Sequence, residues 1–145
     1  MMMRTAFVAL AFLALGLSPP ALAQDGSALS HARAEIERGE ALLDEERWDE
    51  AAEVLGSAAQ IMVAEQGAQN PETLAALLVY ALTLEEAERF ADALMMASQI
   101  KAQAAAAQRF TATLMAAELE ARMQWVLGDA EAALQTYELI LPFAE

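Results

Sequence analysis

The chain has 145 residues, with 22 acidic against 8 basic side chains, a formal net charge of −14 and no cysteine. A surface this acidic repels nucleic acid and anionic lipid head groups, and it suits a basic or amphipathic partner. The same charge would equally serve to keep the chain soluble. The absence of cysteine excludes a disulfide framework and a cysteine-linked lipid anchor, so a packed core must supply the stability.

The first residues have the three regions of a secretory signal peptide. Arg4 gives a basic start, residues 6–17 form an uninterrupted apolar run, and ALAQ provides a small-x-small cleavage site after Ala23. The run is shorter than the roughly 20 apolar residues that a membrane-spanning helix requires. We therefore predict a cleaved signal peptide over 1–23 and export to the periplasm or the medium.

The rest of the chain is expected to form one domain that does not span a membrane. Residues 24–29 are polar and are predicted to be flexible, with Ser27 or Ser30 as a helix cap. The repeat domain is predicted over 30–145. Without residues 1–23 the chain carries 7 basic and 22 acidic residues, a net charge of −15.

Composition and spacing predict an all-α protein. Ala, Leu, Glu, Gln and Met dominate, and these are the strong helix formers. Apolar residues recur at steps of three and four, as in Trp48, Ala51, Leu55 and Met62, and no segment alternates with a period of two. The predicted helices cover 30–46, 48–65, 71–88, 90–108, 111–127 and 130–141.

The turns that separate these helices differ in how clearly the sequence marks them. QGAQNPET (66–73) combines a helix-ending glycine, a capping asparagine and a proline suited to the first helical position. LGDA (127–130) indicates a tight turn. The weakest break lies in 104–113, where we expect a turn near Arg109–Thr111, although one long helix through this segment is the alternative.

Three acidic, alanine-rich phrases indicate an internal repeat: LDEERWDEAAEVL (43–55), LEEAERFADAL (84–94) and WVLGDAEAALQTY (125–137). Equivalent positions are separated by 42 and then 40 residues, a period typical of helical repeat arrays. Small residues at matching positions predict where paired helices cross closely. The aligned columns are Gly39, Ala81 and Ala121; Ala51, Ala93 and Ala133; and Ala58, Ile100 and Ile140.

These columns resemble the tetratricopeptide repeat, with the aromatic residues Trp48 and Phe90 opening the second helix of the first two units. The long spacing is similar to the 42-residue variety of kinesin light chains. The resemblance implies an α-solenoid of about three antiparallel helix pairs. Glu35, Gln124 and Ala130 depart from the bulky or aromatic residues of the pattern, and a plain alanine-rich bundle is the alternative.

No residue pattern points to an enzyme, a cofactor or a metal site. His31 is the only histidine, no glycine-rich phosphate loop occurs, and the dense carboxylates lie on predicted helices rather than in calcium loops. His31 and Glu35, four residues apart, are expected to be a solvated surface pair.

The resemblance implies a protein-protein interaction scaffold whose first helices line a groove for a peptide or a partner protein. We expect this groove to be acidic and apolar, to suit a basic or amphipathic segment, and to use Arg122 and Trp125 as anchors. The groove residues so predicted are Arg33, Ile36, Glu40, Asp44, Leu78, Leu82, Glu85, Met115, Glu118, Arg122 and Trp125.

The chain end and the surface carboxylates leave other functions open. Leu139, Ile140 and Phe143 are predicted to lack a cover, which favours self-association or docking through the last helix. One alternative function is a carrier of cationic small ligands or metal ions that uses the carboxylates. Another is a structural helical bundle that only oligomerises.

Overall fold

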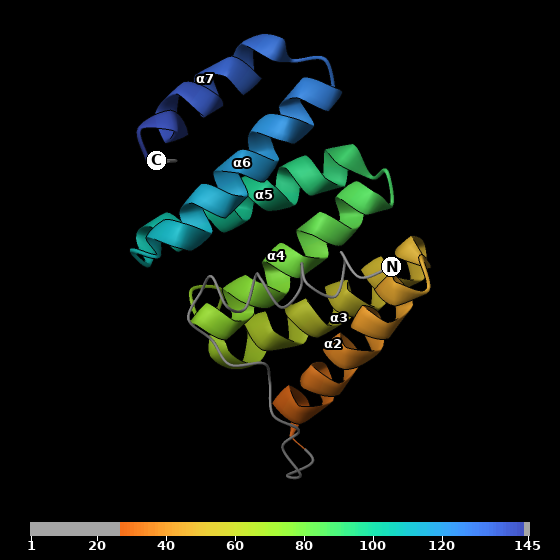
Figure 1. Ribbon diagram of the computed structural model, residues 1–145. Helices are drawn as coiled ribbons and strands as arrows, with labels where there is room; N and C mark the ends of the chain where they lie inside the picture. The colour runs from red at the N-terminus through yellow and green to blue at the C-terminus, as the bar shows by residue number, and fades with distance from the viewer. Residues whose placement is uncertain (1–26, 144–145) are drawn as a thin grey trace.

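A computed structural model describes residues 27–143, which form helices and turns without a strand (Figure 1). The predicted signal peptide over 1–23 lies outside the described residues, as do residues 24–26 of the segment predicted to be flexible. Among residues 27–143, no helix combines the length and apolar character that a membrane span requires. The helices are α2 (Ala28–Asp44), α3 (Trp48–Gln66), α4 (Pro71–Glu86), α5 (Phe90–Ala106), α6 (Phe110–Val126) and α7 (Ala130–Ile140), followed by the 3-10 turn η1 (Leu141–Phe143).

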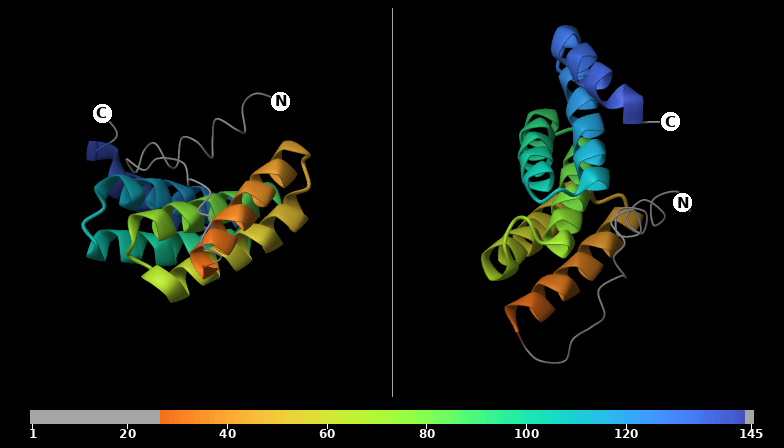
Figure 2. Two further views of the ribbon diagram at one scale, coloured as in Figure 1. Left: turned by 90° about the horizontal axis from the view of Figure 1, so that it is seen from below. Right: turned by 90° about the vertical axis from the view of Figure 1, so that its left-hand side faces the viewer.

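The helices form three antiparallel pairs, α2 with α3, α4 with α5 and α6 with α7, and each helix packs on the next along the chain. Figure 2 shows α2, α4 and α6 along one side and α3 and α5 along the other, while Figure 1 shows α2 and α7 at opposite ends of the stack. This arrangement confirms the predicted all-α solenoid of three helix pairs.

Two apolar clusters hold the pairs together, and α4 belongs to both. Ala75, Ala76 and Val79 of α4 pack with α2 and α3, whereas Leu74 and Leu78 pack with α5 and α6. Both sides of α4 are therefore covered, which a stack of pairs needs because one pair alone cannot bury its apolar stripe.

The columns of small residues predicted from the repeat lie where the helices cross. The members of the columns at Gly39 and Ala51 are all buried. A Cβ atom added to Gly39 would lie 2.5 Å from the Leu55 side chain, so α2 and α3 touch at a point where a methyl group does not fit. Close packing at these positions sets the geometry of the pairs.

Four of the turns between helices have the same construction. The second residue after each helix takes the left-handed conformation, and the backbone N–H of the next residue bonds a carbonyl five residues earlier, as in a Schellman motif. The left-handed residues are Glu46 (φ 60°), Glu88 (φ 58°), Gln108 (φ 56°) and Gly128 (φ 90°). The closing bonds join Arg47 to Leu42 (3.0 Å), Arg89 to Leu84 (2.8 Å), Arg109 to Ala104 (2.8 Å) and Asp129 to Gln124 (2.8 Å).

This turn construction corrects the predicted helix ends. The break in 104–113 exists, but it lies between Ala106 and Phe110, so the alternative of one long helix is wrong. The helices before Glu46, Glu88 and Gln108 end two residues earlier than predicted, because a left-handed residue cannot continue a right-handed helix. At the other end, Ser27 caps α2 by accepting the Ser30 N–H at 3.2 Å.

We expect Glu88→Gly to stabilise the protein by about 1 kcal/mol, because glycine removes the cost of a left-handed side-chain residue while keeping the turn's backbone bonds. Urea denaturation followed by circular dichroism measures this change. Glu53→Gly, the same substitution on the exposed side of α3, should destabilise by about 1 kcal/mol. Destabilisation by both changes would contradict the assigned turn.

Candidate partner-binding face

The candidate site is the face formed by α2, α4 and α6, which we call the A face. The predicted groove residues Ile36 and Leu78 do not belong to its surface, since each is 1% exposed. Leu78 lies in the second apolar cluster because α4 is covered on both sides. For these two residues the prediction was wrong.

The other predicted residues lie on the surface of the A face to different degrees. Met115 packs partly against the first apolar cluster, and Trp125, at the end of α6, is 66% exposed. The half-buried side chains are those of Arg33, Glu40, Leu82, Glu85, Met115 and Arg122, and the exposed ones are those of Asp44, Glu118 and Trp125.

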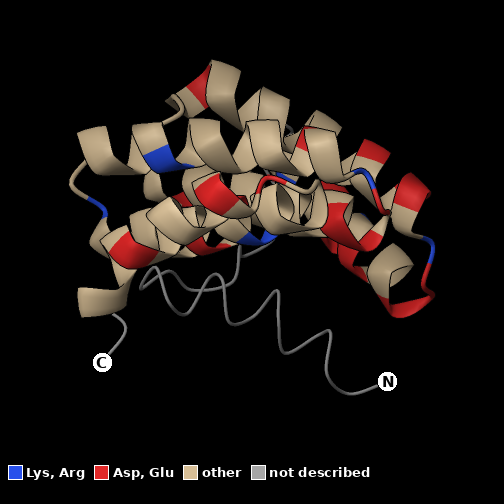
Figure 3. Cartoon of the chain, turned by 90° about the horizontal axis from the view of Figure 1, so that it is seen from above, with Lys and Arg blue, Asp and Glu red and all other residues tan. Residues whose placement is uncertain are grey.

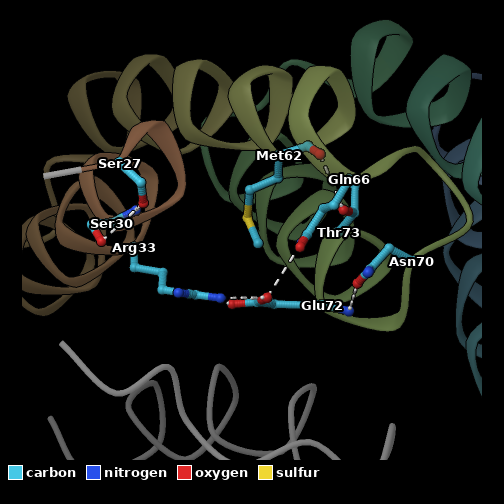
Figure 4. Close-up of polar contacts among 8 residues, drawn as sticks. All are labelled: Ser27, Ser30, Arg33, Met62, Gln66, Asn70, Glu72 and Thr73. Atoms are coloured by element: carbon cyan, nitrogen blue, oxygen red, sulfur yellow. Dashed lines mark hydrogen bonds and ion pairs between the residues drawn. The ribbon is translucent and has the colours of Figure 1, made fainter. Parts of the chain in front are cut away.

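An ion pair joins α2 to the start of α4 across this face. Arg33 Nε donates to Glu72 Oε1 at 2.7 Å and its Nη2 donates to Oε2 at 3.1 Å (Figure 4). Gln66 Nε2 donates to the same carboxylate at 3.2 Å, and the Asn70 side chain caps α4 through the Glu72 N–H. The Arg33 guanidinium, helped by Gln66 and opposed by partial burial, holds the pKa of Glu72 below its ordinary value.

A second ion pair joins the other end of α4 to α6. Arg122 Nε and Nη2 donate to the two carboxylate oxygens of Glu85, at 3.1 and 2.8 Å, and Nη1 donates to Glu118 at 3.2 Å. Two-point contacts of this kind fix geometry as well as charge. Arg33, Glu85 and Arg122, predicted as partner-binding residues, thus connect neighbouring helices within the chain.

The acidic part of the A face lies on α2. Glu40 is half buried beside Glu37 and Asp44, and burial, together with these like charges, raises its pKa. Glu40 and Asp44 form no salt bridge within the described residues. Burial is the larger cause of the raised pKa and repulsion the smaller, and a cation placed here would offset both.

Further carboxylates surround a hollow beside the A face. Red segments gather at the end of the molecule that carries the α2–α3 turn (Figure 3). The hollow, of about 380 Å³, lies between that turn and the α4–α5 turn and was not predicted as a binding site. Its lining consists of Glu46, Arg47, Trp48, Asp49, Glu50, Glu86, Ala87 and Glu88.

Sequence reasoning missed a buried carboxylate between α5 and α6. Glu120 is 5% exposed, accepts a hydrogen bond from Ser98 Oγ at 2.8 Å and pairs with Lys101. The signal that could have found it is the repeat itself, because Glu120 and Tyr80 hold equivalent positions, each just before a small residue of the Ala81 column.

Two residues were considered as a possible metal-binding pair, His31 and Glu35. His31 is exposed, and Glu35 bonds Arg38 at 3.3 Å. In the part of the chain that the structure describes, no three His, Asp or Glu side chains are grouped as metal ligands.

The model of the tetratricopeptide repeat family matches residues 30–106, which is more than half of the chain. The protein therefore belongs to the tetratricopeptide repeat family, whose repeats form protein-protein interaction scaffolds. Neither the comparison with curated proteins nor that with solved structures finds a match.

We expect Glu72→Gln to destabilise the fold by about 1–2 kcal/mol at pH 7, because it removes the charge from a two-point bonded pair that is half buried. Since the pKa of Glu72 is lowered in the folded state, its contribution is present above pH 4.5 and is lost as the pH falls through the folded value. Urea denaturation at pH 7 and pH 3 measures both effects.

The control for this measurement is Glu65→Gln, on the exposed side of α3, which should change stability by less than about 0.5 kcal/mol. A cycle with Arg33→Gln should show coupling between Arg33 and Glu72. Strictly additive effects would mean that the pair does not hold α2 to α4.

Proposed function

We propose that the protein is an exported scaffold that binds a basic, amphipathic peptide or protein segment on the A face. Membership of the tetratricopeptide repeat family supports the general role, since these repeats bind proteins. The features of residues 1–23 support export to the periplasm. A mature chain that begins at Gln24 in the periplasmic fraction, identified by mass spectrometry, tests the export step.

The distribution of charge on the A face carries the proposal. Both arginines that α2 and α6 place on this face, Arg33 and Arg122, already bind glutamates of α4. Glu40 and Asp44 remain as carboxylates for a partner's cations. A partner with lysine or arginine along one side would therefore meet negative charge on α2 without competition from these arginines.

The apolar part of the same face suits the other side of such a partner. Leu82 of α4 is half buried, and Trp125 and Val126 at the end of α6 are exposed. An exposed tryptophan three residues after Arg122 on α6 is of the type that dominates binding energy at interfaces. The combination favours an amphipathic segment over a purely charged one.

We expect Trp125→Ala to weaken binding of an amphipathic lysine-leucine peptide about tenfold, through loss of an aromatic contact of roughly 1.4 kcal/mol. Fluorescence anisotropy of the labelled peptide measures the dissociation constant, which should also rise with salt. Met95→Ala truncates a comparably exposed apolar side chain of α5 and should leave binding unchanged. Equal effects of the two changes, or equal binding of a glutamate-leucine peptide, would refute the proposed site.

We expect Glu40→Gln to stabilise the free protein by roughly 0.5 kcal/mol at pH 7 while weakening the same peptide severalfold, because the change removes a half-buried charge and its repulsion with Glu37 and Asp44. The folded-state pKa of Glu40 is raised, so the stability gain appears only as the pH rises through that value and vanishes below about pH 4.5. Urea denaturation and anisotropy measure the two effects. Glu53→Gln on α3 is the control, and a loss of stability at pH 7 would contradict the assignment.

A further inference from the structure

The outer side of α7 is the surface that a further helix pair would cover. Inside the stack, the second helix of each pair is packed against the first helix of the next pair: α3 against α4, and α5 against α6. Among the described residues, only the three-residue 3-10 helix η1 follows α7. Its outer side is separate from the A face, so the inference below does not rest on the proposed function.

The two internal interfaces share one register. A Cβ atom added to Gly56 of α3 would lie 2.9 Å from the Tyr80 ring of α4, and Ser98 of α5 bonds Glu120 of α6 at 2.8 Å. Gly56 and Ser98 each lie five residues after the small residue of the Ala51 column. Tyr80 and Glu120 each lie one residue before the small residue of the Ala81 column. The same two positions therefore face each other in both interfaces.

Continuing this register onto α7 places Glu138 at the centre of its outer side. Leu134 and Leu141 flank it, at 60% and 61% exposure. In α3 the equivalent flanking residues, Ala52 and Ala59, are each 1% exposed, because α4 covers them. The outer side of α7 and the first residue of η1 therefore present an apolar surface with one central carboxylate, termed here the α7 face (Leu134, Glu138 and Leu141).

The charge of the α7 face indicates what covers it. Between α5 and α6, the cation that neutralises Glu120 is Lys101. Leu141, the first residue of η1, takes the position equivalent to Lys101, and residues 123–143 contain no lysine, arginine or histidine. We propose that the α7 face binds an amphipathic helix of a partner protein, in the register of α4 and α6, with a lysine or arginine facing Glu138 and small or apolar residues against Leu134 and Leu141.

A second copy of this chain fits the α7 face less well. Its first described helix, α2, has Arg38 at the position of Tyr80 and Glu120, and so offers a cation opposite Glu138. However, Glu37 stands where Val79 and Leu119 are buried. Stacking α2 on α7 would press that carboxylate against leucine, at the cost of desolvating it.

The test uses a helix of this chain as the probe. A labelled peptide of residues 110–126 is prepared unchanged and with Glu120→Lys, and anisotropy with the full-length mature protein measures both affinities. The lysine peptide should bind at least tenfold more tightly than the unchanged one. Glu138→Lys in the protein should reverse that preference, and Leu141→Ala should weaken the lysine peptide at least fivefold, with helix content unchanged in both variants.

Two control variants show whether the peptide binds at the α7 face itself. Leu139→Ala truncates a similarly exposed leucine of α7 outside the α7 face, and Glu53→Gln removes an exposed carboxylate of α3; both should leave the lysine peptide's affinity unchanged. A preference insensitive to Glu138→Lys, or an equal loss in Leu139→Ala, would overturn the proposal. So would sedimentation equilibrium showing a dimer that Leu141→Ala abolishes, because a second copy would then cover the face.

Discussion

The close approach of two helices at a small residue is the constraint on which this architecture depends. At Gly39 the backbone of α2 lies so near Leu55 of α3 that a methyl group would collide with it. Ala81 and Ala121 are buried at the same position of the next two pairs. Larger side chains there would force the helices of each pair apart, and the apolar surfaces that join successive pairs would lose their register.

The fold could be predicted largely from repetition, because the period places small, apolar and turn residues at the same points three times. The errors fell at helix ends, where Glu46, Glu88 and Gln108 adopt a conformation usually left to glycine. A prediction of turns that relies on glycine does not find such residues. The triplets Glu46–Trp48, Glu88–Phe90 and Gln108–Phe110, each with arginine followed by an aromatic residue, would have located all three turns.

The surface was harder to predict than the fold, because exposure depends on which neighbour covers each helix. The family resemblance implies that Leu78 lines a groove, yet α4 is packed on both sides and the leucine is buried. The ion pairs between distant segments could not be predicted from the sequence either. Arg33 pairs with Glu72, 39 residues away, and Arg122 pairs with Glu85, 37 residues away.

The Lys101–Glu120 pair makes the stability of the α5–α6 interface sensitive to chemical modification of one side chain. Lys101 is the one lysine in the sequence. Acylation of its amine would abolish its positive charge and leave a carboxylate that is 5% exposed without its cation, and unpaired charges in such surroundings strongly destabilise packing. Acylation of the Lys101 amine would thus destabilise the interface between the second and third helix pairs, and no other lysine side chain would compete for the reagent.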